Sequence, residues 1–325
     1  MNEVRTRIET DGETVAAVVR AALDVPWSRA RQLCYDGRVW VDDERARDPA
    51  VRVRRGMTLV IRPQGPREVV TEHTLEPSRI VFADADVVVV DKPAGLQSVP
   101  FAEDDHDSVV QRLAVALRKL EHRRSPPPRV VHRLDKDTTG LLVFARSRTA
   151  ERELGQQFRV HSVHRRYLGL AHGDVRTQTI RSVLVGDRGD GLRGSWRRSG
   201  RAPKDGREAI THVEVETRHA LDAASFTTGS PGSVTWVRCR LETGRTHQIR
   251  IHLAESGHPL VGEPVYAKGM RDPGLRWPEG VTPRVMLHAA ELGFVHPGTG
   301  EEIAFVSPEP ADFEAWRRRL AGPLP

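Results

Sequence analysis

Apolar and polar positions alternate at two different spacings along the first sixty residues. Residues 16–23 carry apolar side chains at helical spacing, and residues 27–35 form a second helical pattern that stops at Gly37. Residues 38–41 alternate in polarity and residues 56–61 form an apolar run, so each is predicted to be a strand. The pattern predicts a small unit of two helices followed by a hairpin.

A polar, aperiodic stretch at residues 63–78 contains several prolines and predicts a linker. After it, residues 80–90 predict a hairpin, residues 110–120 a helix, Ser147 the cap of another helix, and the stretch after Pro310 a last helix. Regular alternation of strands and helices is absent. We therefore expect an α+β fold with a mixed, largely antiparallel central sheet and flanking helices, preceded by a small α/β domain.

Length and composition narrow the class of protein. A chain of 325 residues fits two domains of unequal size. No apolar run reaches about 18 residues, so no transmembrane helix is expected, and the charged N-terminus lacks the apolar stretch of a secretory signal. The two cysteines, Cys34 and Cys239, match neither a disulfide framework nor a zinc spacing. A reducing cytoplasm is the expected compartment, and a monomer the simplest assembly.

The distribution of charge is more informative than its total of +6. Residues 159–207 contain twelve Arg or Lys residues against four Asp residues, a net charge of +8. A GC-rich genome raises the arginine content of a chain, but it does not explain this clustering. Arginine presents a planar fork suited to phosphate, so the segment predicts a polyanionic partner.

Three segments place polar side chains among apolar runs. Residues 130–145 enclose a charged loop that contains Asp135, residues 165–170 place Tyr167 among arginines, and residues 241–253 carry a dense polar motif. A surface turn capped by an Asp and a Tyr that covers a sheet edge are the plainer interpretations. In the third segment Arg245, Gln248 and His252 are predicted to share a helical face, and Arg250 to point elsewhere.

Two other chemistries fit these residues poorly. The spacing of His247, His252 and His258 lacks the i, i+4 pair of a zinc helix, so no metal site is expected. Asp135 and Asp137 lie on one tight loop, whereas a glycosidase needs two carboxylates that flank a bond at about 5–9 Å.

Several motifs occur together in one order along residues 79–310. They are HRLD at 132–135 followed by TTGLL at 138–142, TGRTHQIR at 243–250, KPAGL at 92–96, the Arg-Tyr pair at 166–167, and LHA at 287–289. This set resembles the signature of the RluA-type pseudouridine synthases. The first unit resembles an S4-type RNA-binding domain, on Ser28, Arg29, Gly37 and the pattern of residues 39–61. The expected domains are residues 1–65 (S4-like), 66–78 (linker) and 79–325 (catalytic, with the pseudouridine synthase fold).

The resemblance implies conversion of uridine in structured RNA to pseudouridine, most simply in large-subunit ribosomal RNA, with transfer RNA as another possible substrate. It implies no cofactor and no metal. Asp135 matches the essential carboxylate of the family, which acts as nucleophile or as base on the ribose. Arg250 matches the arginine that pairs with this carboxylate, and Tyr167 matches the tyrosine that packs against the base. Arg133 matches the residue proposed to fill the space of the flipped base. Contacts to RNA are expected from Arg133, Arg165, Arg166, Arg245, His247, Arg29 and Arg31.

Two alternatives remain at this stage. A catalytically idle RNA-binding or ribosome-assembly protein would use the same scaffold, although it has no need of Asp135, Tyr167 and Arg250 together. A glycosidase-like hydrolase would pair Asp135 with Asp137 or Glu263 and release free base or sugar.

Overall fold

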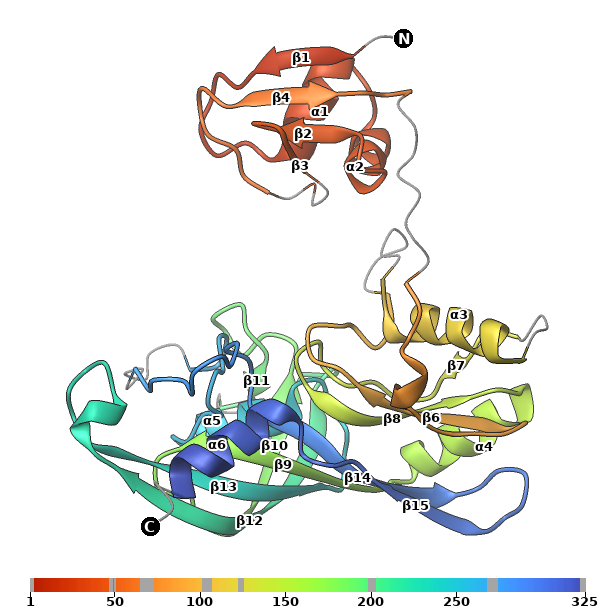
Figure 1. The fold of residues 1–325 in the computed structure, drawn as a ribbon, viewed down its shortest axis with the longest axis vertical. Coiled ribbons are helices and arrows are strands. Elements are labelled where there is room, and N and C mark those ends of the chain that lie inside the picture. The colour runs from red at the N-terminus through yellow and green to blue at the C-terminus, as the bar shows by residue number, and fades with distance from the viewer. Residues whose placement is uncertain are drawn as a thin grey trace. The chain divides into compact units, whose positions relative to one another are not determined.

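The computed structural model of the chain describes residues 3–46, 49, 51–64, 73–100, 107–121, 126–197, 203–267 and 274–321. It divides into two compact units. The first contains the chain up to His73, and the larger one contains Thr74–Val99 and the chain from Asp107 on (Figure 1). No helix in the described ranges is long and apolar enough to cross a membrane.

The first unit packs two helices on a small sheet. Its elements are β1 (Val4–Arg7), α1 (Val15–Leu23), α2 (Trp27–Tyr35), β2 (Val39–Val41), β3 (Glu44–Arg45) and β4 (Thr58–Ile61). The strands form one antiparallel sheet in the order β1-β4-β2-β3. Val19, Leu33 and Leu59 are fully or almost fully buried between the helices and the sheet. The two predicted helices and the two predicted strands are therefore present, and these strands, β2 and β4, pair antiparallel, with β3 in the connection between them.

The sequence pattern missed two strands of this unit. Both β1 and β3 lie at the edges of the sheet, and their side chains are exposed or only half-buried. An edge strand made of polar residues lacks the apolar alternation by which a strand is recognised.

The second unit is built on a sheet of eleven strands within the described ranges. Its strands and helices are η1 (Pro77–Arg79), β5 (Ile80–Ala83), β6 (Val87–Lys92), α3 (Val109–Glu121), β7 (Arg129–Val130), β8 (Thr139–Ala145), α4 (Arg148–Arg159), β9 (His164–His172), β10 (Gln178–Val185), β11 (Gly194–Ser195), β12 (Arg207–Leu221), η2 (Ala223–Ser225), β13 (Gly232–Leu241), α5 (Gln248–Glu255), β14 (Leu287–Val295), β15 (Glu302–Val306) and α6 (Ala311–Ala321).

The strand order is β11-β10-β12-β13-β9-β14-β8-β6-β5, with β15 beside β14 and β7 beside β8. Only the β14–β8 pair is parallel among the pairings of this described sheet. The expected mixed and largely antiparallel sheet with flanking helices is confirmed.

Helices cover both faces of the sheet. Along β6, Val88 and Val90 join the core with α3, whereas Val87 and Val89 join the core with α4, and all four valines are fully buried. Alternate side chains of a strand point to opposite faces, so a run of four valines requires cover on both. Helix α4 begins where it was predicted, because the Ser147 hydroxyl accepts a hydrogen bond from the Ala150 amide.

Helix α6 lies across β9, β13 and β14 (Figure 1). Its Phe313 and Trp316 side chains are fully buried against Trp236 of β13 and Met286. The opposite face of β9 and β13 belongs to the core that also contains Ile249 of α5. In this arrangement the N-terminal ends of β8, β9 and α5 surround one shared space.

Two glycines, one in the central strand β8 and one in helix α4, differ in the space around them. Gly140 in β8 has φ +105°, and a Cβ there would lie 2.3 Å from the Ala289 carbonyl oxygen of β14. We expect Gly140→Ala to lower the free energy of unfolding by about 3 kcal/mol. A Cβ at Gly155 in α4 would meet no atom within 4 Å, so Gly155→Ala should raise the free energy of unfolding by about 0.5–1 kcal/mol. Urea denaturation of both variants measures the contrast, and equal effects would contradict it.

Candidate active site

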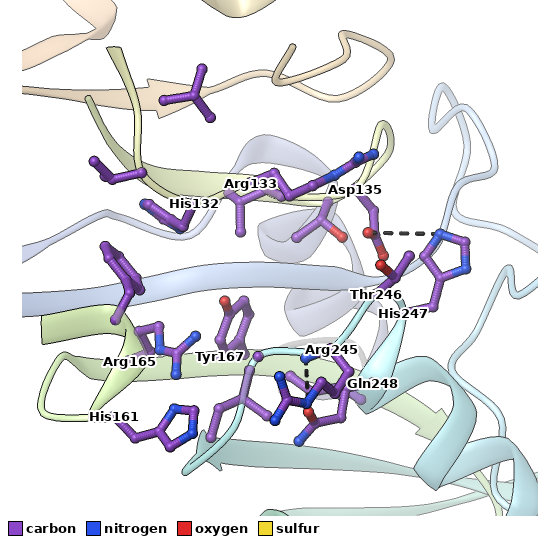
Figure 2. A pocket seen from close by; sticks show the side chains of 18 of the residues that line it. His132, Arg133, Asp135, His161, Arg165, Tyr167, Arg245, Thr246, His247 and Gln248 are labelled. Atoms are coloured by element: carbon purple, nitrogen blue, oxygen red, sulfur yellow. Dashed lines mark hydrogen bonds and ion pairs between the residues drawn. The ribbon is translucent and has the colours of Figure 1, made fainter. Parts of the chain in front are cut away.

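One pocket of about 630 Å³ brings together segments that are far apart in the sequence (Figure 2). Its walls come from the loop before β8, from α4, from β9 and from the stretch that leads into α5. Seven of the ten residues expected to act in catalysis or RNA binding line it: Arg133, Asp135, Arg165, Tyr167, Arg245, His247 and Arg250.

Strand register explains why these segments meet. Strand β14 lies between β8 and β9, with Ala289 beside Gly140 on one side and beside Tyr167 on the other. Cys239 of β13 is the partner of Tyr167 across the next pairing, and β13 leads into α5. The loop before β8, the Tyr167 ring and the start of α5 therefore open onto the same side of the sheet.

Asp135 lies at the centre of the charged groups in the pocket. Its Oδ2 atom is 3.3 Å from Arg250 Nη1, and its Oδ1 atom is 3.7 Å from His247 Nε2. The side chain is 18% exposed, so it is screened from bulk water but still reachable from the pocket. The predicted pairing of Asp135 with Arg250 is present in the structure.

Arg250 is held mainly by a second carboxylate. Its Nε and Nη2 atoms donate to the two oxygens of Glu263 at 2.7 and 2.9 Å, and the Glu263 side chain is fully buried. Burial opposes the charged guanidinium, but the hydrogen bonds and charges of Glu263 and Asp135 raise the pKa of Arg250. Burial likewise opposes the charge on Glu263, and the paired guanidinium lowers its pKa. Arg250 thus stays charged and oriented toward Asp135.

His247 borders Asp135 on the other side as a neutral group. Burial, which outweighs the nearby Asp135 carboxylate, lowers the pKa of His247. The Tyr266 hydroxyl lies 2.6 Å from His247 Nδ1, and burial raises the pKa of that tyrosine to about 12. The pair fixes the orientation of the imidazole, whose Nε2 atom faces Asp135 at a distance longer than a hydrogen bond.

Tyr167 forms an apolar wall beside Asp135. Its ring is 8% exposed and belongs to the same core as Leu241 and Ile249. Burial raises the pKa of Tyr167, with Asp135 acting in the same direction and Arg165 against it. The hydroxyl therefore stays protonated at neutral pH.

Buried polar side chains hold the backbone of the Asp135 loop from behind. Ser98 binds both backbone groups of Leu134, donating to its carbonyl at 2.7 Å and accepting from its amide at 3.0 Å. Lys92 Nζ donates to the Lys136 carbonyl at 2.6 Å, and Arg284 Nη1 donates to the Asp137 carbonyl at 3.0 Å.

Arg284 connects this loop to the C-terminal helix. Its guanidinium makes a two-pronged ion pair with Asp312 of α6, and it also contacts the Thr139 hydroxyl at 3.4 Å. The position of the Asp135 loop is therefore coupled to the packing of α6 on the sheet.

The other residues selected from the sequence lie outside the centre of the pocket. Arg166 points to the opposite face of β9 and lies 3.8 Å from Glu291. Arg29 and Arg31 are exposed on α2 of the first unit. The expectation that Arg245 shares a helical face with Gln248 and His252 is wrong, because α5 begins only at Gln248.

Gln248 and His252 do share a face, since both bind the Thr211 hydroxyl. His258 bonds to the His172 carbonyl, and so the three histidines of this region have separate partners. Within the described ranges no cluster of three His, Cys, Asp or Glu side chains could hold a metal ion.

Several residues that build the site carry no signal in the local sequence pattern. Arg284, Ser98 and Tyr266 stand in stretches without a readable periodicity or motif. Their partners lie far along the chain, and only strand pairing brings them together. Lys92 belongs to the KPAGL motif, but its role in holding Lys136 follows from the contacts alone, as does the pairing of Glu263 with Arg250.

Comparisons with known proteins show which family this chain matches. A family model described as RNA pseudouridylate synthase matches residues 86–255, and the S4 domain model matches residues 16–59. Ribosomal large subunit pseudouridine synthase D of Zymomonas mobilis is 35% identical over 273 residues, which cover 82% of this chain and 80% of that protein. The protein of the same name from Xanthomonas campestris is 33% identical over 298 residues, covering 88% of this chain and 82% of that protein.

A solved structure shares the fold. The human RNA pseudouridylate synthase domain containing 4 superposes with a TM-score of 0.57 at 23% identity, and the match covers 75% of this chain and 93% of that one.

The buried Lys92 offers a test of the loop support. Burial lowers the pKa of Lys92 to about 7 from its ordinary 10.5, although Asp137 and Asp135 oppose the shift. We expect Lys92→Met to lower the free energy of unfolding by about 1–3 kcal/mol at pH 8, because two carbonyls lose their donor.

The difference between wild type and Lys92→Met should also grow from pH 7 to pH 9. In that window the unfolded chain holds a proton on Lys92 that the folded chain has released, so the stability of the wild type rises with pH. Urea denaturation at several pH values measures both effects. Lys119→Met, at an exposed position of α3, is the control. An equal loss in the control, or a difference that shrinks as the pH rises, would contradict this account.

Proposed function

The chain belongs to the RNA pseudouridylate synthase family, and from this membership we propose that it isomerises uridine in large-subunit ribosomal RNA with Asp135 as the catalytic carboxylate. The family predicted from the motifs is thereby confirmed, and the protein is an RNA pseudouridine synthase. The observation that carries the residue assignment is the meeting of Asp135, Arg250 and Tyr167 in one pocket, from three separate segments.

The reaction needs one carboxylate with access to a sugar carbon. The N1–C1′ bond of uridine breaks, the uracil turns, and a C5–C1′ bond forms, so no atom is gained or lost overall. As nucleophile Asp135 would attack C1′, and as base it would remove a proton from the ribose. Both roles need an ionised carboxylate, and the Arg250 guanidinium lies 3.3 Å from Asp135 as its counter-charge. Tyr167 supplies the wall against which the free uracil turns.

A uridine in a folded RNA has to leave its stack to reach this pocket. Extrusion costs a few kcal/mol, which contacts to the displaced strand offset. Arg133 is exposed at the pocket edge two residues before Asp135, where it suits the role of filling the vacated space. The basic segment 159–207 suits contacts with phosphates, which position a substrate without reading its sequence.

Two observations favour ribosomal RNA as the proposed substrate. The relatives from Zymomonas mobilis and Xanthomonas campestris are named for the ribosomal large subunit. An S4 domain also precedes the catalytic part, with Arg29 and Arg31 exposed on α2. In this proposal residues 1–65 dock the RNA, residues 66–78 link the domains, and residues 79–325 carry out the isomerisation.

The catalytic assignment is tested by Asp135→Asn, with Asp137→Asn on the same loop as a matched control. We expect Asp135→Asn to abolish pseudouridine formation while the RNA dissociation constant changes by less than about threefold. Asp137→Asn should remain active, because the structure assigns its side chain no contact with the pocket. Mapping of pseudouridine in RNA treated with each variant gives the answer. Pseudouridine formed by Asp135→Asn would remove this carboxylate from the mechanism, and release of free uracil would instead support a hydrolase.

The docking role of the first unit is tested without truncation. We expect the double variant Arg29→Gln/Arg31→Gln to weaken binding to long ribosomal RNA and to reduce the slope of log affinity against log salt by about two. The control is Arg5→Gln/Arg7→Gln, which removes two exposed arginines from β1 of the same unit. Fluorescence anisotropy over a salt series measures the slopes, and equal slopes for the two double variants would argue against docking through α2.

A further inference from the structure

Arg165 is a buried cation that no carboxylate neutralises. Its relative exposure is 7%, the same as that of Arg250. Arg250 has Glu263 and Asp135 as partners, whereas Arg165 makes no ion pair within the part of the chain that the structure describes. Its Nε and Nη2 atoms are shielded from solvent and have no hydrogen-bond partner there. A buried charge without compensation destabilises a fold, so this position needs a reason.

The guanidinium lies in the wall of the active-site pocket. Side chains alternate along β9, so Arg165 and Tyr167 face the pocket while Arg166 faces away, as Figure 2 shows for the first two. The Arg165 guanidinium carbon lies 5.6 Å from the centre of the Phe158 ring. A Cβ on Gly244 would lie 2.6 Å from Arg165 Nη1, so the bare glycine leaves room for the guanidinium. Packing, and not hydrogen bonding, holds the cation in place.

Two titratable side chains near Arg165, His132 and Tyr167, are neutral, and Glu151 in the same pocket wall pairs with Arg129. Burial, and secondly the charge of Arg165, lower the pKa of His132 to about 3, so its imidazole is neutral. The His132 Nε2 atom accepts a hydrogen bond from the Val143 amide. Tyr167 is protonated, because burial raises its pKa. Asp135 is bound at the other side by Arg250. The pocket therefore has a negative group at Asp135 and an unmatched positive group at Arg165.

Uracil and ribose are both neutral, so the charge of a bound nucleotide resides on its phosphodiester groups. We propose that Arg165 binds a phosphodiester of the RNA at the target uridine, and that the free enzyme keeps this guanidinium unpaired for that contact. The inference rests on the proposed function in one respect, namely that the pocket receives a nucleotide. The planar fork of arginine matches two phosphate oxygens, and a desolvated contact of this kind fixes the sugar relative to Asp135.

A neutral linkage in the substrate tests the contact directly. The full-length protein is titrated with a minimal RNA substrate in which one phosphodiester near the target uridine at a time is replaced by an uncharged methylphosphonate. For the wild type we expect one linkage, 5′ or 3′ of the target, whose replacement weakens binding about tenfold. Arg165→Met should bind the unmodified RNA about tenfold more weakly and should show no further loss at that linkage.

The matched control is Arg166→Met, which changes the neighbouring residue on the opposite face of β9. It should retain the full sensitivity at the same linkage, because its guanidinium faces Glu291 and not the pocket. A wild-type scan with no sensitive linkage next to the target overturns the proposal even if Arg165→Met does not fold. If the replacement of that phosphodiester weakens binding equally in wild type and Arg165→Met, the proposal is overturned as well. A uracil carbonyl would then be left as the partner of Arg165.

The stability of the RNA-free protein gives a second readout. Because the charge is uncompensated, Arg165→Met should raise the melting temperature while it weakens RNA binding. A purely structural role predicts the reverse, a lower melting temperature with unchanged affinity, and that result would overturn the proposal. Neither measurement requires turnover. If the protein binds RNA through Arg165 but forms no pseudouridine, the proposed function is refuted and the inference about Arg165 stands.

Discussion

One guanidinium shared by two carboxylates organises the active site. Arg250 gives Glu263 two short hydrogen bonds and Asp135 a single contact of 3.3 Å. Glu263 is fully buried and compensates the cation, which allows Arg250 itself to be buried. Of the two carboxylates, Asp135 is the one that lines the pocket. The carboxylate is thus held in place and still faces the pocket, as the role proposed for Asp135 requires.

The rest of the larger unit fixes the position of that carboxylate. Ser98, Lys92 and Arg284 come from three different parts of the chain and bind the backbone of this loop. Their contacts are at Leu134, Lys136 and Asp137, on either side of Asp135. Through Asp312, Arg284 extends this support to α6, which packs on the far face of the strands that carry Tyr167. A reactive side chain on a loop is placed accurately when its backbone is bound at several points. Through Arg284, the packing of α6 therefore affects the position of the Asp135 loop.

The pocket also contains a buried charge, that of Arg165, which lowers the stability of the fold. Arg250 and Arg165 are equally buried, but only Arg250 is compensated by carboxylates in the described structure. Sites that bind charged ligands often carry such uncompensated groups, because the ligand completes the interaction. The S4 domain presents a different kind of basic surface, with exposed arginines on a helix. In the proposals made above, the exposed arginines of α2 contact the RNA backbone in water, and Arg165 contacts it inside the pocket.

Local physical rules determined much of this protein from its sequence. Helical spacing and a terminal Asp-Gly placed α2 at its observed bounds, Ser147 marked the start of α4, and the order of motifs identified the family and the loop of Asp135. These features depend on residues within a few positions of one another. The pairing of Asp135 with Arg250 spans 115 residues, and in the sequence it came from family resemblance alone.

The tertiary structure decided the contacts that no local pattern encodes. It selected Glu263 as the main partner of Arg250, brought Arg284 to the Asp137 carbonyl, and left Arg165 without a counter-charge. Each of these depends on the register in which β8, β14 and β9 pair, and that register is set by packing across the whole sheet. A sequence specifies which side chains a strand exposes on each face. Which distant groups those side chains meet is fixed only when the strands pair.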